Sequence, residues 1–162
     1  MCTLSSPGEV SGLPVYCLIR RSPSCVWSAL PREDCTVSME FNRLIPELSA
    51  DDFEKSLSFY TDVLGFQIEY QRPEHKFAFL SYQGSQIMLE QLNMNWKAGK
   101  GEYPFGRGIN FQMLVDDIEV IISSLREHGY PLMVEPETHW YRKDDLLVGQ
   151  NEFLVMDPDG YV

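Results

Sequence analysis

The chain has 162 residues, of which 44% are hydrophobic, and this composition supports one packed domain. Its 13 Lys and Arg stand against 24 Asp and Glu, and the resulting net charge of −11 argues against nucleic acid and anionic membranes as partners. No stretch approaches the ~20 apolar residues that cross a membrane. All four cysteines lie in the first 35 residues without a Cys-x-x-Cys pair, which argues against zinc and indicates a reducing, cytoplasmic location.

The first part of the chain, residues 1–40, is expected to be a disordered or non-domain extension. The charges of residues 1–35 cancel, so that the whole negative charge falls on residues 36–162, and the extension lacks an amphipathic pattern. We therefore expect the folded domain to span residues 41–162.

The first half of this domain, 43–92, has the pattern βαβββ. A strand is predicted at 43–50, and Ser49, Asp51 or Asp52 can cap a helix whose apolar residues recur at helical spacing until Gly65. Three further strands are expected at 66–72, 76–82 and 85–92.

A linker at 93–107 separates this module from a second one at 108–162. The second module is predicted to contain a strand at 109–115, a helix ending at Gly129, a strand at 130–135, an irregular excursion at 136–150 and a strand at 151–156. The turn Asp157-Pro158-Asp159-Gly160 follows. The sequence reaches Val162 where the first module continues into another strand, so we expect the last strand of the second module to be truncated.

The two halves repeat each other. Asp51-Asp52-Phe53-Glu54 matches Asp116-Asp117-Ile118-Glu119, and each helix closes on Gly followed by an aromatic residue. Such a duplication predicts two similar units in one domain, with a site between or beneath them. The expected fold class is therefore α+β, with two βαβββ modules that form a curved mixed sheet cup.

These motifs resemble the vicinal oxygen chelate superfamily, which includes glyoxalase I, extradiol dioxygenases and bleomycin resistance proteins. The segments that carry the resemblance are Ser56–Tyr60, Val63–Phe66 and Asp157–Tyr161. A closer resemblance to the bleomycin-resistance branch is carried by Ile45–Leu48, Met88–Gln91, Glu102–Gln112 and Trp140–Arg142.

In the enzymes of this superfamily a divalent metal is held by one residue on the first and one on the fourth strand of each module. Here the first-strand positions are Ile45 and Asn110, and neither is a usual ligand for such a metal. The fourth-strand position of the first module falls on Met88 or Glu90, and that of the second lies beyond Val162. We therefore expect no metal, no cofactor and no catalytic residue. His139 is interpreted as a surface or packing residue rather than as a site residue.

The remaining features favour ligand capture by a non-catalytic protein. Aromatic rings stack on flat ligands, and carboxylates attract a cationic one. The predicted ligand-binding residues are Glu47, Glu90, Trp96, Tyr103, Phe105, Trp140 and Tyr141. The resemblance implies a homodimer that sequesters a bleomycin-type cationic drug in grooves formed by both subunits. Two alternatives stay open: a glyoxalase- or dioxygenase-like enzyme that acts on a small metabolite, and a truncated chain that binds nothing.

Overall fold

The structure is a computed structural model, and it describes residues 39–93 and 101–162. All of these belong to one compact unit, Met39–Val162. The predicted extension at 1–40 lies almost entirely outside the described residues and stays a prediction. None of the helices in the described part of the chain is long and apolar enough to span a membrane.

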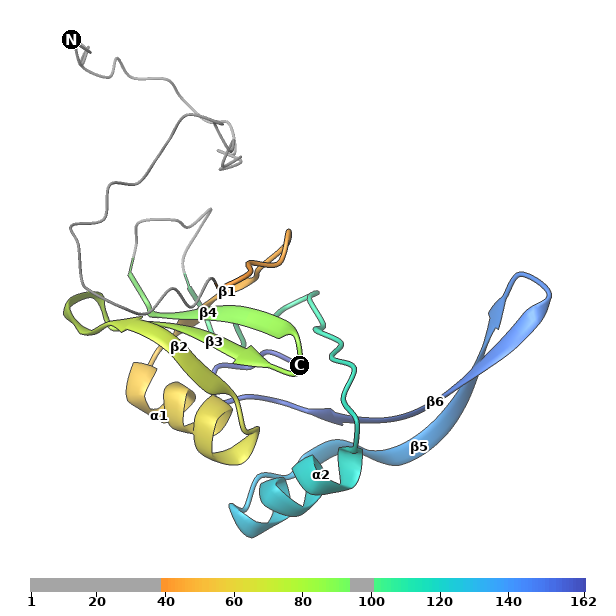
Figure 1. The fold of residues 1–162 in the computed structure, drawn as a ribbon. Helices are drawn as coiled ribbons and strands as arrows, with labels where there is room; N and C mark the ends of the chain where they lie inside the picture. Colours follow the sequence, from red (N-terminus) through yellow and green to blue (C-terminus); the bar gives the residue numbers. More distant parts are fainter. Residues whose placement is uncertain (1–38, 94–100) are drawn as a thin grey trace, which may run out of the picture. The chain divides into compact units, whose positions relative to one another are not determined.

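The first half forms a four-stranded sheet with one helix on it (Figure 1). Its elements are β1 (Glu47–Ala50), α1 (Phe53–Ser58), the π-helical turn η1 (Phe59–Val63), β2 (Gln67–Arg72), the 3-10 turn η2 (Pro73–His75), β3 (Phe77–Tyr82) and β4 (Ser85–Gln91). The strand order is β1-β4-β3-β2, with β1 parallel to β4 and the other pairs antiparallel. The predicted βαβββ order is present, although the first strand begins later than expected.

Local sequence signals set the ends of the first helix. The Asp52 carboxylate accepts a hydrogen bond from the Lys55 backbone N–H, which satisfies one of the free donors at the helix start. Gly65 follows the last turn with φ +82°, a left-handed conformation that Gly adopts without steric cost. Between these points Phe53, Phe59 and Val63 are buried against the sheet.

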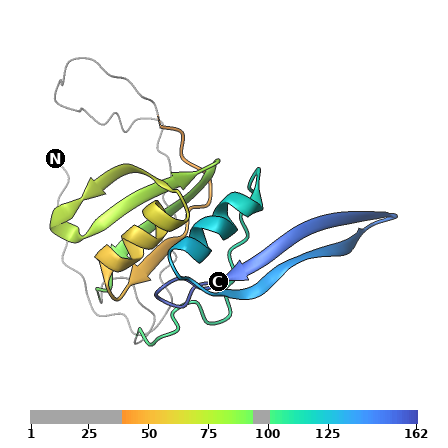
Figure 2. The ribbon, with the colours of Figure 1, turned by 90° about the horizontal axis from the view of Figure 1, so that it is seen from below.

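The second half contains α2 (Ile118–Glu127), β5 (Leu132–Lys143) and β6 (Leu146–Val155). The Asp117 carboxylate caps α2 as Asp52 caps α1, by accepting a hydrogen bond from the Glu119 N–H. Helix α2 lies beside η1, as Figures 1 and 2 show from two sides. The rings of Phe59 and Tyr130 join the two halves, with centroids 4.7 Å apart.

The prediction of an irregular excursion at 136–150 is wrong. Strands β5 and β6 form a long antiparallel hairpin that runs through this region, and its tip points away from both helices (Figures 1 and 2). Asp144 occupies the turn with φ 54°, in the left-handed region that Asp tolerates better than most residues. The excursion contains strand-forming residues such as Thr138, Trp140 and Tyr141, and their cross-strand pairing outweighs the polar residues near the turn.

The predicted strand at 109–115 is also not formed. Within the described ranges this segment pairs with the end of the chain through one backbone hydrogen bond, from the Phe111 N–H to the Val162 carbonyl at 2.7 Å. A strand requires a ladder of such bonds along its length. The fold class is nevertheless α+β with a mixed sheet, as expected.

The turn at 157–160 is a buried connection between the halves. The Asp159 carboxylate accepts hydrogen bonds from the Ser56 hydroxyl and, at 2.7 Å, from the Asp51 N–H. Asp157 accepts one from the Tyr60 hydroxyl. Each of these bonds links positions about a hundred residues apart, so the Asp-Pro-Asp-Gly motif holds the end of the chain on α1 and β1.

Candidate functional site

The sheet of the first half has one face packed under α1 and one face free of helices. Residues that pair across adjacent strands project their side chains to the same side. Two cross-strand rows make up the free face: Ser49–Glu90–Phe77–Arg72 and Glu47–Met88–Phe79–Tyr70. This face therefore combines carboxylates, aromatic rings and one guanidinium group.

Glu47 and Glu90 are diagonal neighbours on β1 and β4, so the structure places these two predicted site residues together. Burial raises the pKa of Glu47 most, and the neighbouring Glu90 carboxyl raises it further, while Arg72 acts in the opposite direction. An open depression of about 350 Å³ lies beside Glu90. Its lining residues are Glu74, His75, Lys76, Glu90, Gln91 and Asn93.

The predicted aromatic residues do not gather into one stacking site. Trp96 lies outside the described residues. The Tyr103 hydroxyl is 3.5 Å from the Met156 sulfur, and the Phe105 ring packs edge-on against Tyr161. Both contacts hold the loop at 101–108 against the C-terminal turn.

Trp140 and Tyr141 are adjacent on β5 and therefore point to opposite faces of the hairpin. The Trp140 ring covers Gly149, its partner on β6, and 66% of the residue stays exposed. Tyr141 instead joins a polar cluster on the other face.

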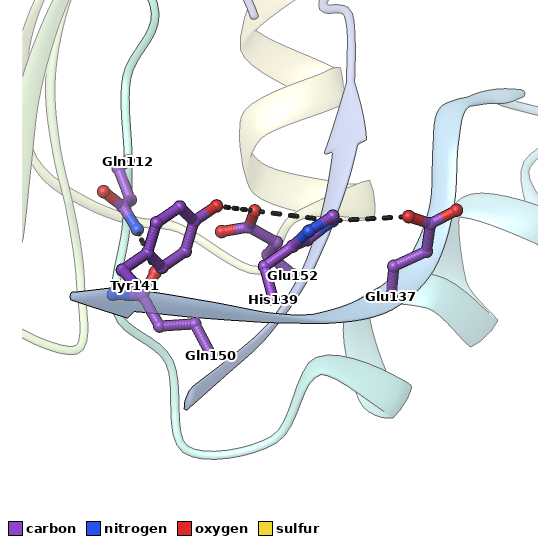
Figure 3. Close-up of polar contacts among 6 residues, drawn as sticks. All are labelled: Gln112, Glu137, His139, Tyr141, Gln150 and Glu152. Atoms are coloured by element: carbon purple, nitrogen blue, oxygen red, sulfur yellow. Dashed lines mark hydrogen bonds and ion pairs between the residues drawn. The ribbon is translucent and has the colours of Figure 1, made fainter. Parts of the chain in front are cut away.

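This cluster contains His139 and two carboxylates (Figure 3). The His139 Nε2 atom lies 3.3 Å from Glu137 Oε2 and 3.9 Å from Glu152 Oε1. Glu137, His139 and Tyr141 alternate along β5 and share its face, and Glu152 reaches them from β6. The hairpin thus presents an imidazole ring between two carboxylates.

The remaining contacts orient this cluster. The Tyr141 hydroxyl donates a 2.6 Å hydrogen bond to Glu152 Oε1, and this bond is the main reason that the pKa of Tyr141 is raised. Beside it, the Gln112 amide donates to Gln150 Oε1 at 3.0 Å, which brings the segment at 109–115 to the same face (Figure 3).

Sequence reasoning interpreted His139 as a surface or packing residue because it placed the residue in an irregular excursion. The two-residue spacing of Glu137, His139 and Tyr141 within a run of strand-forming residues was the signal that predicts a shared face.

The described residues do not fit the metal site that the superfamily's enzymes share. Ile45 has no donor atom, and Asn110 offers only an exposed amide. In the ranges 39–93 and 101–162, no group of three or more His, Cys, Asp or Glu side chains is arranged to hold a metal ion.

Comparison with known proteins places this fold in a family. Residues 41–162 match the model of the Glyoxalase/Bleomycin resistance protein/Dioxygenase superfamily. The chain belongs to this superfamily. The match confirms the resemblance that the sequence motifs indicated, although it does not show the bleomycin-resistance branch.

The similar proteins are named lactoylglutathione lyases and not bleomycin resistance proteins. A probable lactoylglutathione lyase of Synechocystis is 31% identical over 116 residues, which cover 68% of this chain and 82% of that protein. The lactoylglutathione lyase of Haemophilus influenzae is 31% identical over 119 residues, covering 70% of this chain and 83% of that protein. A solved structure from the mobile metagenome of V. pseudocholerae matches with a TM-score of 0.56 and 20% sequence identity. The match covers 76% of the present chain and 92% of the solved one. At this identity the likeness supports the fold alone.

Proposed function

We propose that this chain is a glyoxalase-like enzyme that acts on a small thiol conjugate of the lactoylglutathione type. The family match and the names of the relatives support this class of substrate. The observation that carries the proposal is the position of His139 between Glu137 and Glu152 on one exposed face.

The chemistry of such a substrate centres on a proton at the carbon next to a carbonyl group. Moving that proton requires a base whose pKa lies near the working pH. An imidazole has an unperturbed pKa of about 6.5 and serves this role more often than any other side chain. In this mechanism His139 takes the proton and returns it to the neighbouring atom.

The carboxylates around His139 stabilise the imidazolium ion that forms during the transfer. Glu152 is held in place by the Tyr141 hydroxyl, and Glu137 approaches the same ring nitrogen from the same strand. The His139 side chain is 45% exposed, so a substrate has access to the ring. Because Ile45 and Asn110 do not fit a metal, the mechanism assigns no step to one.

The experiment supplies the chain with glutathione and a 2-oxoaldehyde, which combine to a hemithioacetal, and follows the rise in thioester absorbance as this adduct is isomerised to lactoylglutathione. His139→Gln is expected to lower kcat/KM by about 10²–10⁴-fold, the usual contribution of general acid–base catalysis. His128→Gln is the matched control, because His128 caps α2 and bonds the Ser124 carbonyl away from the cluster. No turnover by the wild-type chain, or full activity of the His139 variant, would contradict the proposal.

Sequestration of a bleomycin-type cationic drug is the second candidate. The feature that favours it is the free sheet face, where Glu47 and Glu90 share a face with the partly exposed ring of Tyr70. Phe77 and Phe79 are buried beneath this face. Carboxylates and rings together recognise a flat cation. This second candidate function includes a homodimer, because residues of both subunits would form the drug-binding groove.

Calorimetric titration separates the two candidates. Binding of bleomycin that weakens with added salt and is lost in a Glu47→Gln, Glu90→Gln double variant supports sequestration. If no heat of binding is measured at high micromolar bleomycin, sequestration is contradicted. Sedimentation of the same sample measures whether the protein is a dimer.

A further inference from the structure

We propose that the segment Glu40–Asn42 is a strap that closes the free sheet face, and that its release opens an aromatic site for a flat cationic ligand. The proposal rests on the second candidate function, because it concerns the same surface, and it adds a means of controlling access to that surface. Three observations support it: two buried rings on the free face, a third ring that covers one of them, and the hydrogen bonds that hold the strap.

The first observation is the burial of Phe77 and Phe79, which are only 2% and 1% exposed. Both lie on β3 between Ala78 and Leu80, which point into the core beneath α1. The alternation of a strand therefore places the two phenylalanine rings on the opposite, free face. Rings on that face are buried only where other side chains lie over them.

The second observation identifies the side chains that cover these rings. From β2, the Arg72 guanidinium stands 3.8 Å from the centroid of the Phe77 ring. Tyr70, also on β2, stacks on Phe79 with centroids 5.2 Å apart and an angle of 11° between the rings. The Phe41 ring packs edge-on against Phe79 at 5.3 Å. Phe41 precedes β1 and belongs to no strand, so part of the cover over Phe79 is not fixed by the sheet.

The third observation is the set of hydrogen bonds that holds the strap on the sheet. The Asn42 N–H donates to Gln86 Oε1 at 2.7 Å, and the Asn42 side-chain amide donates to the Gly84 carbonyl at 2.7 Å. The Gln86 amide donates to the Glu40 carbonyl at 2.8 Å. All three bonds are exposed, and Phe41 itself is 44% exposed. Because water competes for such contacts, the strap can leave the sheet while the core stays folded.

The surface beneath the strap defines the class of ligand. Departure of Phe41 gives access to the rings of Phe79 and Tyr70, which stack on flat rings and attract cations. Glu47 lies in the same cross-strand row as these rings, and Glu90 lies in the next row. The two carboxyl groups add negative charge beside the rings, so the site favours a flat ring system that carries a positive charge.

Phe41 and such a ligand compete for the same ring surface. Only the fraction of molecules with the strap released binds the ligand, so the apparent affinity is lowered by that fraction. A strap that is closed in about 90% of molecules lowers it about tenfold.

The test measures binding of thioflavin T, a flat cationic dye whose fluorescence rises when it is held rigid, to the full chain. Phe41→Ala is expected to bind the dye at least about tenfold more tightly than the wild-type chain. Leu44→Ala is the matched control, because Leu44 is an apolar residue close to the strap that is 83% exposed, and its dye affinity should equal that of the wild type. Equal affinities of Phe41→Ala and the wild type, or binding by neither, would overturn the proposal.

A second variant loosens the strap and leaves all the rings in place. Gln86→Met removes the two hydrogen bonds that the Gln86 side chain makes to the strap, so it should also strengthen dye binding. In the Phe41→Ala background it should add no further gain, because the covering ring is already absent. An unchanged affinity of Gln86→Met, or a full gain on top of Phe41→Ala, would contradict the role of the strap.

The position of the dye is tested by adding Glu47→Gln and Glu90→Gln to Phe41→Ala, which should weaken binding and its dependence on salt. Unchanged binding would place the dye elsewhere and overturn the proposed site. Calorimetry of Phe41→Ala with bleomycin gives a separate answer. Tight dye binding without heat from bleomycin contradicts sequestration of the drug and supports the strap, whereas equal bleomycin affinities of Phe41→Ala and the wild type support sequestration and contradict the strap.

Discussion

The Tyr60 hydroxyl donates a 2.7 Å hydrogen bond to the Oδ2 atom of Asp157, which lies 97 positions later in the chain. Both residues are buried, with 7% and 6% of their surface exposed. Burial raises the pKa of Tyr60 well above its usual value, and the Asp157 charge adds to the effect. Burial likewise raises the pKa of Asp157, against the hydrogen bonds that it accepts. The bond joins the C-terminal turn to the first half of the fold.

Removing this donor is predicted to destabilise the fold. Tyr60→Phe leaves a buried carboxylate without one of its donors, at a cost of about 1–3 kcal/mol in the free energy of unfolding. Urea denaturation measures the change. Tyr141→Phe is the matched control, because its hydroxyl also binds a carboxylate but lies on the surface, and it should change stability by less than about 0.5 kcal/mol. Equal effects of the two substitutions would show that the buried bond adds nothing.

Two glycines with the same backbone conformation are predicted to differ in their tolerance of a side chain. Gly84 and Gly160 have φ values of +84° and +88°. A Cβ atom at Gly84 meets no atom within 4 Å, so Gly84→Ala should cost only the left-handed strain of about 1–2 kcal/mol. A Cβ atom at Gly160 lies 2.3 Å from the Pro104 Cβ, and this overlap should add about 1–3 kcal/mol. Thermal and urea melts of both variants provide the comparison; similar midpoints would show that the loop at Pro104 shifts freely.

The stability of the protein is predicted to depend on the ionisation of Glu47. Its folded-state pKa is raised above the ordinary value of about 4.5, chiefly by burial, so the folded state favours the protonated form. Ionisation therefore lowers stability as pH rises through the raised pKa. Glu47→Gln should be more stable than the wild-type chain near neutral pH, and the difference should vanish at pH values below the ordinary pKa of a glutamate side chain.

Urea midpoints measured across this pH range test the prediction. The same substitution in a Glu90→Gln background should show a smaller pH-dependent difference, because Glu90 is the second cause of the raised pKa. A difference between Glu47→Gln and wild type that does not change with pH would contradict the assignment.

Sequence by itself determined the features that depend on neighbours along the chain. Asp52 and Asp117 cap the two helices, and Gly65 and Gly129 follow their ends with positive φ. The helical spacing of apolar residues and the short alternating runs were sufficient to predict the α+β class and the strands of the first half. Motifs such as Asp157–Tyr161 were sufficient for the superfamily.

Only the tertiary structure decided the features that depend on pairing between distant segments. Residues 136–150 carry a mixed polar pattern, and they become strand because β5 and β6 supply each other's hydrogen bonds. That pairing brings His139 to Glu152, which local periodicity does not reveal. The segment at 109–115 has the pattern of a strand and forms none, because a strand requires a neighbouring backbone, which no local pattern provides.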